Sequence, residues 1–573
     1  MPDVTFTDAQ LALIRAETAT YVEACPGAGK TQAIVQRFID RPLTHPRKGI
    51  GLISFTNAAI DEARARCTTE PALKEAPNFV GTIDGFINRF LVGPTFLARR
   101  GFAPRFHESW SAVPHSLVKV SGVQLSASLD WFAVRDGAAH LSPERVPIER
   151  RRAAASLPSP DLARLEGEAM RIWNRFVERG TLSASAARVA MRSYLTDPKR
   201  REKLGALLSD RFVEVIVDEV QDCSADDILV LDFLHEFGVT IIAVGDPDQS
   251  IYGFRSDAPA DITTFVSKLA EGERLNGNFR SSPAICAAVD SLRTGSERDD
   301  PIGRHAEVKS PVVLLSYNRR QSLPQLIASV IEAHDISRKD LIVLAHSADH
   351  ARVAAGAPGS GSDSTSKLIV LARAHHLISD PHRSGAERVA AMRSLERTIR
   401  ELGVSEVVEL DHPDYLDACG LSERTFREGC LRLAAALPRP FEMKPSEFRA
   451  ALAALTDSHA QLRWTSQPLR SPPGDTWPSP PAVQPEGATS FAHSTIHGLK
   501  GRQSPAVALV IPESRAEGDG VQQWCGGLSG EERRVLYVGA SRAERLLIVA
   551  AHESTFDAVK ARLEADGVPT EVP

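Results

Sequence analysis

The chain has 573 residues, of which 43% are hydrophobic and 24% are charged, and its formal net charge at pH 7 is −6. A chain of this length and apolar content can bury several cores, roughly three to five domains by the usual domain size. The negative balance excludes a global basic field, so any attraction to nucleic acid has to come from a local groove.

No stretch approaches the roughly 20 apolar residues of a membrane span, and the polar N-terminus lacks the apolar region of a signal peptide. The seven cysteines contain no C-x-x-C pair and no closely spaced set of four. This spacing argues against a zinc ribbon or an iron–sulfur cluster and favours a reducing compartment. We therefore expect a cytoplasmic protein.

The first motif in the chain is a glycine-rich loop at residues 24–31, Ala-Cys-Pro-Gly-Ala-Gly-Lys-Thr. Glycines let a backbone wrap closely around an anion, and the helix that follows directs its N–H groups and its positive dipole end toward it. Lys30 adds a charge for the β and γ phosphates, and Thr31 offers the hydroxyl that Mg²⁺ needs. The loop predicts a nucleotide site. Because Ala24 stands where the strict pattern has Gly, an ordinary glycine-rich turn is the alternative.

Two apolar runs further along the chain predict buried parallel strands that end in polar residues. The run at 215–217 leads into Asp218, which can reach Mg²⁺ through water, and Glu219, which can take a proton from the attacking water. The run at 240–244 leads into Gln249, an amide that can sense a γ-phosphate, and then into aromatic residues that can stack bases. For the first run, the alternative is an ordinary strand followed by a solvated acidic turn.

Together, the ordered motifs of this chain resemble those of superfamily 1 DNA helicases of the UvrD/Rep/PcrA type. Besides the segments above, the resemblance rests on residues 6–10, 54–59, 81–86, 278–281, 494–501 and 531–543. It implies an α/β fold, with two RecA-like parallel-sheet P-loop NTPase cores that each carry a mainly helical insertion. It also implies ATP and Mg²⁺ as cofactors, and single-stranded DNA or a tailed DNA duplex as the partner.

Each motif residue then takes the role that its position has in that family. Catalytic roles fall to Lys30, Asp218, Glu219, Gln249, Arg280 and Arg542, the two arginines acting as fingers on the γ-phosphate. ATP contacts fall to Gln10, Cys25, Pro26, Gly27, Ala28, Gly29, Lys30, Thr31, Gln32, Phe279, Arg280, Gln503 and Arg542, and metal contacts to Thr31 and Asp218. DNA contacts fall to Phe55, Thr56, Asn57, Arg66, Thr82, Tyr252, Phe254, Arg255, His497 and Lys500.

Several positions depart from the family pattern. Phe254 stands in place of the usual Trp, which keeps a stacking face of smaller area. Asp84 replaces a His beside the DNA, Gln503 replaces a Glu that resembles the ribose contact, and Gln32 stands where Arg is common. None of these changes removes a charge that hydrolysis needs, so the resemblance implies an active ATPase with altered affinity for DNA or nucleotide. For Phe254, packing in a core is the alternative, and for His497, a purely structural role.

The motif spacing divides the chain into two cores and two insertions. These are 1–92 with 206–275 (first core, 1A), 93–205 (insertion 1B), 276–366 with 488–573 (second core, 2A) and 367–487 (insertion 2B-like). Insertion 1B is Ala- and Arg-rich and mainly helical by pattern, and the 2B-like insertion is shorter than the family's usual 2B domain.

Apolar runs and periodicities predict several elements in the second half of the chain. The second core should contain strands at 312–315, 341–344, 506–511 and 546–550. In the second insertion, Val389, Met392, Ile399 and Leu402 form a helical stripe that Gly403 ends, and such a stripe is more often core than partner surface. After the last motif we expect a strand, a helix and a tail, and no fused nuclease domain.

The resemblance implies an ATP-dependent DNA helicase that moves along a single strand in DNA repair, recombination or phage defence. Motion should be 3′ to 5′, because the motifs are those of the UvrD branch. One alternative is an ATP-gated DNA-sensing subunit that serves a separate nuclease and unwinds little by itself, since the chain also resembles the compact helicase subunits of phage-defence (Gabija-type) systems. The other is a nucleotide-regulated scaffold that binds no DNA, which would leave the aromatic and Thr-rich motifs without a use.

Overall fold

The computed structural model describes residues 5–41, 47–55, 60, 76–113, 116–251, 262–295, 297–357, 366–380, 385–404, 407, 412–477, 490–513 and 519–573. The chain divides into two compact units. Unit 1 comprises residues 1–106, 177–357 and 489–573, and unit 2 comprises residues 107–176 and 358–488. All the segments that resemble helicase motifs therefore belong to unit 1.

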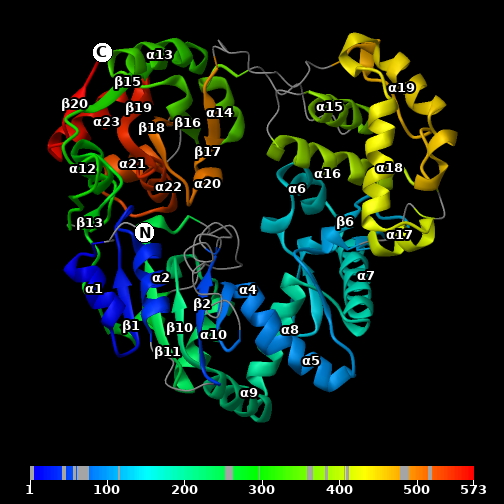
Figure 1. Ribbon diagram of the computed structural model, residues 1–573, viewed down its shortest axis with the longest axis horizontal. Coiled ribbons are helices and arrows are strands. Elements are labelled where there is room, and N and C mark those ends of the chain that lie inside the picture. The colour runs from blue at the N-terminus through cyan, green and yellow to red at the C-terminus, as the bar shows by residue number, and fades with distance from the viewer. Residues whose placement is uncertain are drawn as a thin grey trace. The chain divides into compact units, whose positions relative to one another are not determined.

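The first core of unit 1 is built on a six-stranded sheet in which every neighbouring pair is parallel (Figure 1). Its strand order is β12 (Ala270–Glu271), β1 (Thr20–Glu23), β11 (Thr240–Gly245), β10 (Phe212–Val217), β2 (Gly49–Ser54) and β3 (Phe79–Thr82). The strands are buried at nearly every position, as expected for a parallel sheet that is covered on both faces. Parallel strands end at one edge, which places the residues after β1, β10 and β11 together.

The second core is built on another six-stranded parallel sheet (Figure 1). Its strand order is β17 (Ala492–Thr495), β16 (Leu341–Ala345), β18 (Ser504–Val510), β19 (Ala543–His552), β15 (Val312–Tyr317) and β20 (Thr570–Glu571). Alternate residues of β15 pack into two separate cores, Val312 and Leu314 on one face and Val313 and Leu315 on the other. Each of the four predicted strands is present, and only Ile511 falls outside its strand.

Helices connect the strands of both cores. Those of the first core are α1 (Asp8–Arg15), α2 (Lys30–Asp40), α4 (Ile83–Phe86), α5 (Gly93–Arg100), α8 (Ala184–Thr196), α9 (Pro198–Arg211), α10 (Ala225–Glu236) and α11 (Ile262–Val266). Those of the second core are α12 (Pro283–Ser291), α13 (Leu323–Ala333), α14 (Ala348–Ala354), α20 (Ile496–Leu499), α21 (Gly520–Cys525), α22 (Glu531–Ala540) and α23 (Glu553–Ala565). Helices α8 and α9 belong to the connection between β3 and β10, and they group with unit 1 although the predicted insertion 1B extends to residue 205.

The first insertion is mainly helical, as predicted, but it also contains short strands that the sequence pattern does not predict. It contains the short strands β4 (Arg105–His107), β5 (Leu117–Val118), β6 (Ala127–Ser128), β7 (Phe132–Arg135), β8 (Ala138–Leu141) and β9 (Thr181–Ser183), with helices α6 (Ile148–Ala155) and α7 (Ser159–Glu178). Strands β7 and β8 form a hairpin whose turn places Asp136 (φ 51°) and Gly137 (φ 76°) in the left-handed region. An Asp-Gly pair between alternating apolar residues is a strong hairpin signal, and it outweighs the Ala-rich composition.

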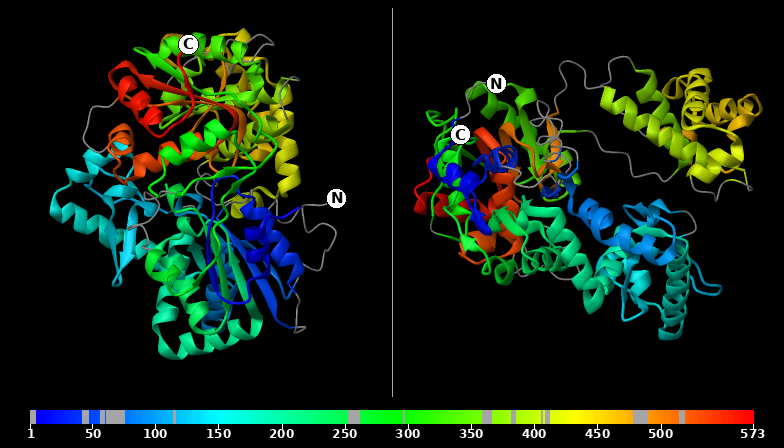
Figure 2. Two further views of the ribbon diagram at one scale, coloured as in Figure 1. Left: turned by 90° about the vertical axis from the view of Figure 1, so that its left-hand side faces the viewer. Right: turned by 60° about the horizontal axis from the view of Figure 1, so that its bottom comes forward.

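Residues 366–477 of unit 2 form a helical group of their own (Figure 2, yellow-green to yellow). Its helices are α15 (Lys367–Ser379), α16 (Gly385–Glu401), α17 (His412–Cys419), α18 (Glu423–Ala436) and α19 (Pro445–Ala454). Met392, Ile399 and Leu402 lie in its core, but Val389 is 54% exposed. The predicted stripe is therefore wrong at Val389, because the described neighbours of α16 cover only its later turns. No described helix combines the length and the apolar character that crossing a membrane requires.

Candidate nucleotide site and neighbouring residues

The glycine-rich loop joins β1 to α2 and holds Gly27 (φ 76°) and Gly29 (φ 69°) in the left-handed region. A Cβ at Gly29 would lie 2.8 Å from Gln10 Nε2 and would displace that amide, and the positive φ of Gly29 also favours glycine there. Gln10 Oε1 accepts the N–H of Thr7 at 2.9 Å, which turns Nε2 toward the loop, where it donates to the Ala28 carbonyl at 2.9 Å. Gln10, one of the expected ATP contacts, is thus held against the loop by two hydrogen bonds. Of the other loop residues, Cys25 and Pro26 are buried and Gln32 is half-buried.

The loop lysine and threonine meet the two acidic residues that follow β10. Lys30 is 8% exposed, and its Nζ lies 3.1 Å from Glu219 Oε2. Thr31 Oγ1 donates to Asp218 Oδ2 at 3.4 Å. Four residues that the sequence predicts for one site, from segments almost 190 positions apart, are therefore brought together at the shared edge of the sheet.

The charges in this cluster shift the protonation of both acids. Burial acts to raise the pKa of Glu219, but the positive charges of Lys30 and Lys500 outweigh it and hold that pKa below its ordinary value. Burial and the adjacent Glu219 carboxylate raise the pKa of Asp218. Glu219 therefore stays ionised and is ready to accept a proton. Its backbone is held at φ 54°, an uncommon conformation for a side chain of this size and one that clusters at functional sites.

Asp218 and Thr31 present the oxygens that a hard divalent cation prefers. Asp218 is 1% exposed, and its Oδ1 has no hydrogen-bond partner among the described residues. A buried carboxylate oxygen without a partner is costly, and a cation would satisfy it. The donor set therefore fits Mg²⁺, which when bound with ATP supplies positive charge to the phosphate oxygens.

The two predicted arginine fingers come from the second core. Arg280 Nε donates to Gln503 Oε1 at 2.8 Å, and its Nη1 donates to the Ser541 carbonyl at 2.8 Å. Arg542 is 2% exposed, and its Nη2 donates to Gln249 Oε1 at 2.9 Å. Gln503, expected at the ribose, holds a finger arginine in this structure, and Gln249 of the first core is bonded directly to the other.

Arg280 lies where the chain passes from one core to the other. On one side, the Phe279 N–H donates to the Gly27 carbonyl of the phosphate loop at 2.9 Å. On the other side, Ser281 Oγ donates to the Ala543 carbonyl at the start of β19 at 2.7 Å. The residues flanking Arg280 are thus bonded to different cores.

Lys500 belongs to the same interface between the cores. Its Nζ donates to both carboxylate oxygens of Asp222, at 2.7 and 2.8 Å, and to the Gln249 carbonyl at 2.8 Å. Burial raises the pKa of Asp222 to about 6 and lowers the pKa of Lys500. In this structure Lys500 is paired with Asp222, and a contact between Lys500 and a DNA phosphate stays a prediction.

Two predicted DNA contacts of the first core lie at the ends of neighbouring strands. Phe55 follows β2 and is half-buried. Thr82 ends β3, and its Oγ1 accepts the Gly85 N–H at 3.0 Å, which caps α4. Parallel pairing of β2 and β3 places both residues at the same edge of the sheet as the nucleotide cluster.

Asp84, which stands where the family has His, is paired with a positively charged side chain. Asp84 Oδ1 lies 2.9 Å from Arg188 Nη2, and Arg188 Nη1 lies 2.8 Å from Asp227 Oδ1. Burial acts to lower the pKa of Arg188, but the charges of Asp227 and Asp84 outweigh it and raise that pKa. The carboxylate that replaces the family's His is therefore paired with a guanidinium.

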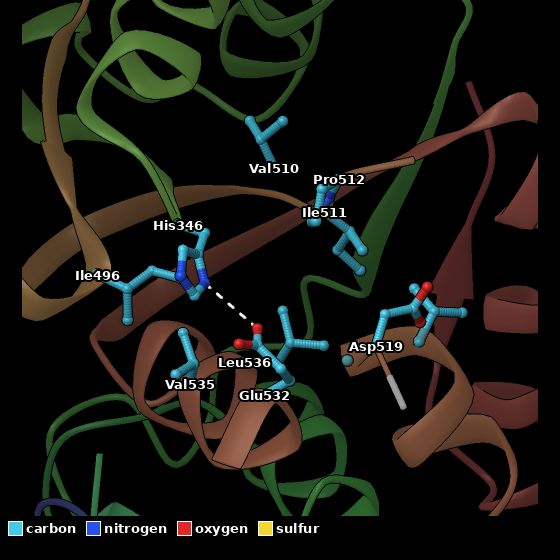
Figure 3. A pocket seen from close by; sticks show the side chains of 11 residues that line it. His346, Ile496, Val510, Ile511, Pro512, Asp519, Glu532, Val535 and Leu536 are labelled. Atoms are coloured by element: carbon cyan, nitrogen blue, oxygen red, sulfur yellow. Dashed lines mark ion pairs between the residues drawn. The ribbon is translucent and has the colours of Figure 1, made fainter. Parts of the chain in front are cut away.

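His497 stands beside another histidine, which the sequence did not single out. The ring centroids of His497 and His346 are 5.8 Å apart, and His346 Nδ1 lies 3.3 Å from Glu532 Oε2 (Figure 3). The hydrogen bond that His346 donates to Glu532 raises the pKa of His346, whereas burial and the neighbouring His346 lower the pKa of His497. Figure 3 shows His346 and Glu532 at the rim of a small recess whose other walls are mostly apolar.

Several predicted DNA contacts lie outside the described residues. They are Thr56, Asn57, Arg66, Tyr252, Phe254 and Arg255. Sequence reasoning, in turn, passed over three buried polar residues between the cores, Asp246, Arg293 and Tyr537. Asp246 and Tyr537 stand inside the recognised motifs, and Tyr537 lies in the apolar stretch Val-Leu-Tyr-Val, where a polar group is a usable signal.

Comparison with known proteins finds similarity to DNA helicases. The model of the UvrD/REP helicase N-terminal domain matches residues 6–119 and 163–270. The chain is 35% identical to DNA helicase II of Escherichia coli over 85 residues, 14% of this chain and 12% of that protein. It is 32% identical over 102 residues to RecBCD enzyme subunit RecB of Buchnera aphidicola, 17% of this chain and 8% of that protein. It is 26% identical over 141 residues to the putative ATP-dependent DNA helicase YjcD of Bacillus subtilis, 23% of this chain and 19% of that protein. Each match thus spans less than a fifth of the relative's length.

Proposed function

We propose that this chain, a UvrD-like superfamily 1 helicase by its N-terminal domain, hydrolyses ATP in order to move along single-stranded DNA. The observation that carries the proposal is that arginines of the second core lie against the nucleotide motifs of the first: Arg280 lies beside Gly27 of the phosphate loop, and Arg542 is bonded to Gln249. Lys30 and Glu219 come from the first core, and Arg280 and Arg542 come from the second. A site shared between two cores can close on ATP and open after hydrolysis, and this cycle can drive movement.

The contacts of the nucleotide cluster suggest how hydrolysis begins. Lys30 is bonded to Glu219, so an incoming γ-phosphate competes with that carboxylate for the lysine charge. Once Lys30 has turned to the phosphate, Glu219 is free to accept a proton from the attacking water. The finger arginines stabilise the charge that develops in the transition state, an effect of roughly three to five decades in rate.

The DNA strand is proposed to cross the edge where Phe55, Thr82 and His497 lie. Stacking on aromatic faces and contacts from hydroxyl groups suit a single strand of any sequence. We propose 3′-to-5′ movement, because the motifs around His497 resemble the UvrD branch. Cytoplasmic location, and a role in DNA repair, recombination or phage defence, are part of the same proposal.

The central test is ATP hydrolysis measured with and without single-stranded DNA. Wild type should hydrolyse ATP faster with DNA, and Lys30→Ala and Glu219→Gln should abolish turnover. Lys48→Ala is the matched control, because Lys48 also belongs to the first core but donates to the Ser209 carbonyl at 2.9 Å instead of entering the cluster. Wild-type turnover in Lys30→Ala would refute the proposal.

Direction is tested by displacing streptavidin from either end of biotinylated single strands. We expect displacement from the 3′-to-5′ track, and displacement only along the opposite track would refute the branch assignment.

A second candidate function is an ATP-gated DNA-sensing subunit that serves a separate nuclease. It is favoured by the names of two relatives, which describe subunits of larger enzymes: one belongs to the RecBCD enzyme and the other to an ATP-dependent helicase/nuclease of Lactobacillus helveticus. The two candidates differ in the behaviour of the isolated chain on a 3′-tailed duplex. Strong unwinding supports the autonomous helicase, and DNA-stimulated hydrolysis without unwinding supports the sensing subunit.

A further inference from the structure

Tyr537 of α22 reaches from the second core to an aspartate of the first. Its side chain is fully buried, and its hydroxyl donates to Asp246 Oδ2 at 2.9 Å. Arg293 Nη2 lies 2.6 Å from the same hydroxyl. Because arginine can only donate, the tyrosine oxygen accepts from Arg293 and its own proton must point at Asp246. The direction of this hydrogen bond is therefore fixed by its neighbours.

Asp246 in turn fixes the amide of Gln249. Gln249 Nε2 donates to the same oxygen, Asp246 Oδ2, at 2.8 Å, while its Oε1 accepts from Arg542 Nη2 at 2.9 Å. One end of the amide faces a carboxylate, which only accepts, and the other faces a guanidinium, which only donates. A rotated amide would lose both bonds, so Asp246 and Arg542 together set the orientation of Gln249.

Asp246 is also connected to the acid of the nucleotide cluster. Its backbone N–H donates to Gln221 Oε1 at 3.0 Å, and Gln221 Nε2 donates to Glu219 Oε2 at 2.6 Å. A continuous chain of buried or part-buried hydrogen bonds thus runs from Tyr537 in the second core to both Gln249 and Glu219 in the first.

We propose that Tyr537 and Asp246 form a positioning pair that lets the placement of the second core decide whether Gln249 and Glu219 are aligned for hydrolysis. The inference rests on the proposed function and adds the residues through which core closure is sensed. Among the described residues, the Tyr537 hydroxyl is bonded to Asp246 and Arg293, so it acts on the nucleotide motifs through Asp246. When the second core moves away, the Tyr537 hydroxyl separates from the Asp246 carboxylate. Gln249 then stays bonded to Asp246, but the hydrogen bond that Tyr537 supplies from the second core is lost.

The test is Tyr537→Phe, which keeps the ring and removes only the hydroxyl. We expect kcat for ATP hydrolysis to fall about tenfold, with KM for ATP changed less than about twofold, because alignment is lost and nucleotide binding is not. Tyr317→Phe is the matched control. Tyr317 is also a buried tyrosine of the second core, and its hydroxyl donates to the Ile511 carbonyl at 2.6 Å, away from the interface. Thermal melting of both variants separates a general loss of stability from a loss of alignment.

A double-mutant comparison shows whether Tyr537 acts through Gln249. Adding Tyr537→Phe to Gln249→Ala should lower kcat by much less than it does in the wild-type background, because the shared path is already broken. Equal fold-losses in the two backgrounds would overturn the inference, as would equal kcat values for Tyr537→Phe and Tyr317→Phe. If wild type itself hydrolyses no ATP, the proposed function fails; if wild type is active and Tyr537→Phe matches the control, only this inference fails.

Discussion

Lys500 Nζ lies 2.7 Å from Asp222 Oδ1, and this ion pair joins the second core to the first. Both side chains are almost inaccessible, at 5% and 2% exposure. Taking two charges out of water is costly, and the cost is recovered only while both partners are present. Breaking this pair by mutation therefore measures how much it contributes to the stability of the interface between the cores.

Lys500→Met should destabilise the protein by about 3 kcal/mol, because it leaves the Asp222 carboxylate buried without its cation. Thermal melting without nucleotide measures the effect. The double variant Lys500→Met/Asp222→Asn should recover a large part of the loss, since no uncompensated charge remains. A single variant that melts like wild type would mean that the pair is open in solution.

Asp84→Asn should strengthen binding of single-stranded DNA. The change removes a negative charge from the sheet edge where DNA is proposed to bind. It also frees Arg188 Nη2 from Asp84, while Nη1 stays bonded to Asp227. If Arg188 then meets a phosphate, the slope of log K against log salt should become steeper by about 0.7. Fluorescence anisotropy at several salt concentrations measures both quantities.

The control for this change is Asp232→Asn, which breaks the Lys268–Asp232 ion pair of the first core. It should leave the salt slope unchanged. If Asp84→Asn binds single-stranded DNA more weakly than Asp232→Asn does, the prediction is wrong and Asp84 itself contributes to DNA binding.

Gly29→Ala should weaken ATP binding, because its Cβ would displace the Gln10 amide from the loop and strain a backbone with φ 69°. Gly101→Ala is the control, since Gly101 has φ 81° but nothing within 4 Å of the added Cβ. Both variants should lose about 1 kcal/mol of stability from the left-handed backbone. Only Gly29→Ala should bind a fluorescent ATP analogue more weakly; normal binding would mean that the loop adapts.

The His346–Glu532 pair should make stability depend on pH. The folded state raises the pKa of His346 above its ordinary value of 6.5, so the pair stabilises fully below about pH 6.5 and is lost as pH rises through the raised value. Since both side chains are about half exposed, the effect should stay below about 1 kcal/mol. The difference in melting temperature between wild type and His346→Gln should thus be larger at about pH 6 than at about pH 8.5.

His350→Gln is the control with the opposite sign, because burial lowers the pKa of His350. Its neutral form is the one that the fold favours, so its contribution should shrink as pH falls. Parallel trends in the two variants would contradict this account.

The juxtaposition of residues in the candidate nucleotide site could be predicted from sequence because its signals are local. The phosphate loop, the acids after β10 and the amide after β11 each follow a buried strand, and a parallel sheet brings such strand ends together without further information. The strands of the second core were equally readable, since continuous apolar runs mark strands that are covered on both faces. The confirmed α/β fold with two RecA-like cores follows from these same signals.

Other features depend on pairings across hundreds of residues, which no local pattern records. Tyr537 meets Arg293 from 244 positions away, and Lys500 meets Asp222 from 278 positions away. The resemblance assigns Lys500 to the DNA, and its hydrogen bonds to Asp222 could not be read from its neighbours in the chain. The exposed Val389 shows a second limit of sequence reasoning. Periodicity predicts which side of a helix is apolar, but it does not predict how much of that side the neighbouring helices cover.

The bonds on either side of Arg280 also restrict how the two cores can part. Phe279 is held by the phosphate loop and Ser281 by β19, so the connecting chain has almost no slack at this point. We expect the cores to part by a rotation about this point, since a translation here would break one of the two bonds. The gap then widens with distance from residue 280, and spent nucleotide should leave by the side remote from Phe279.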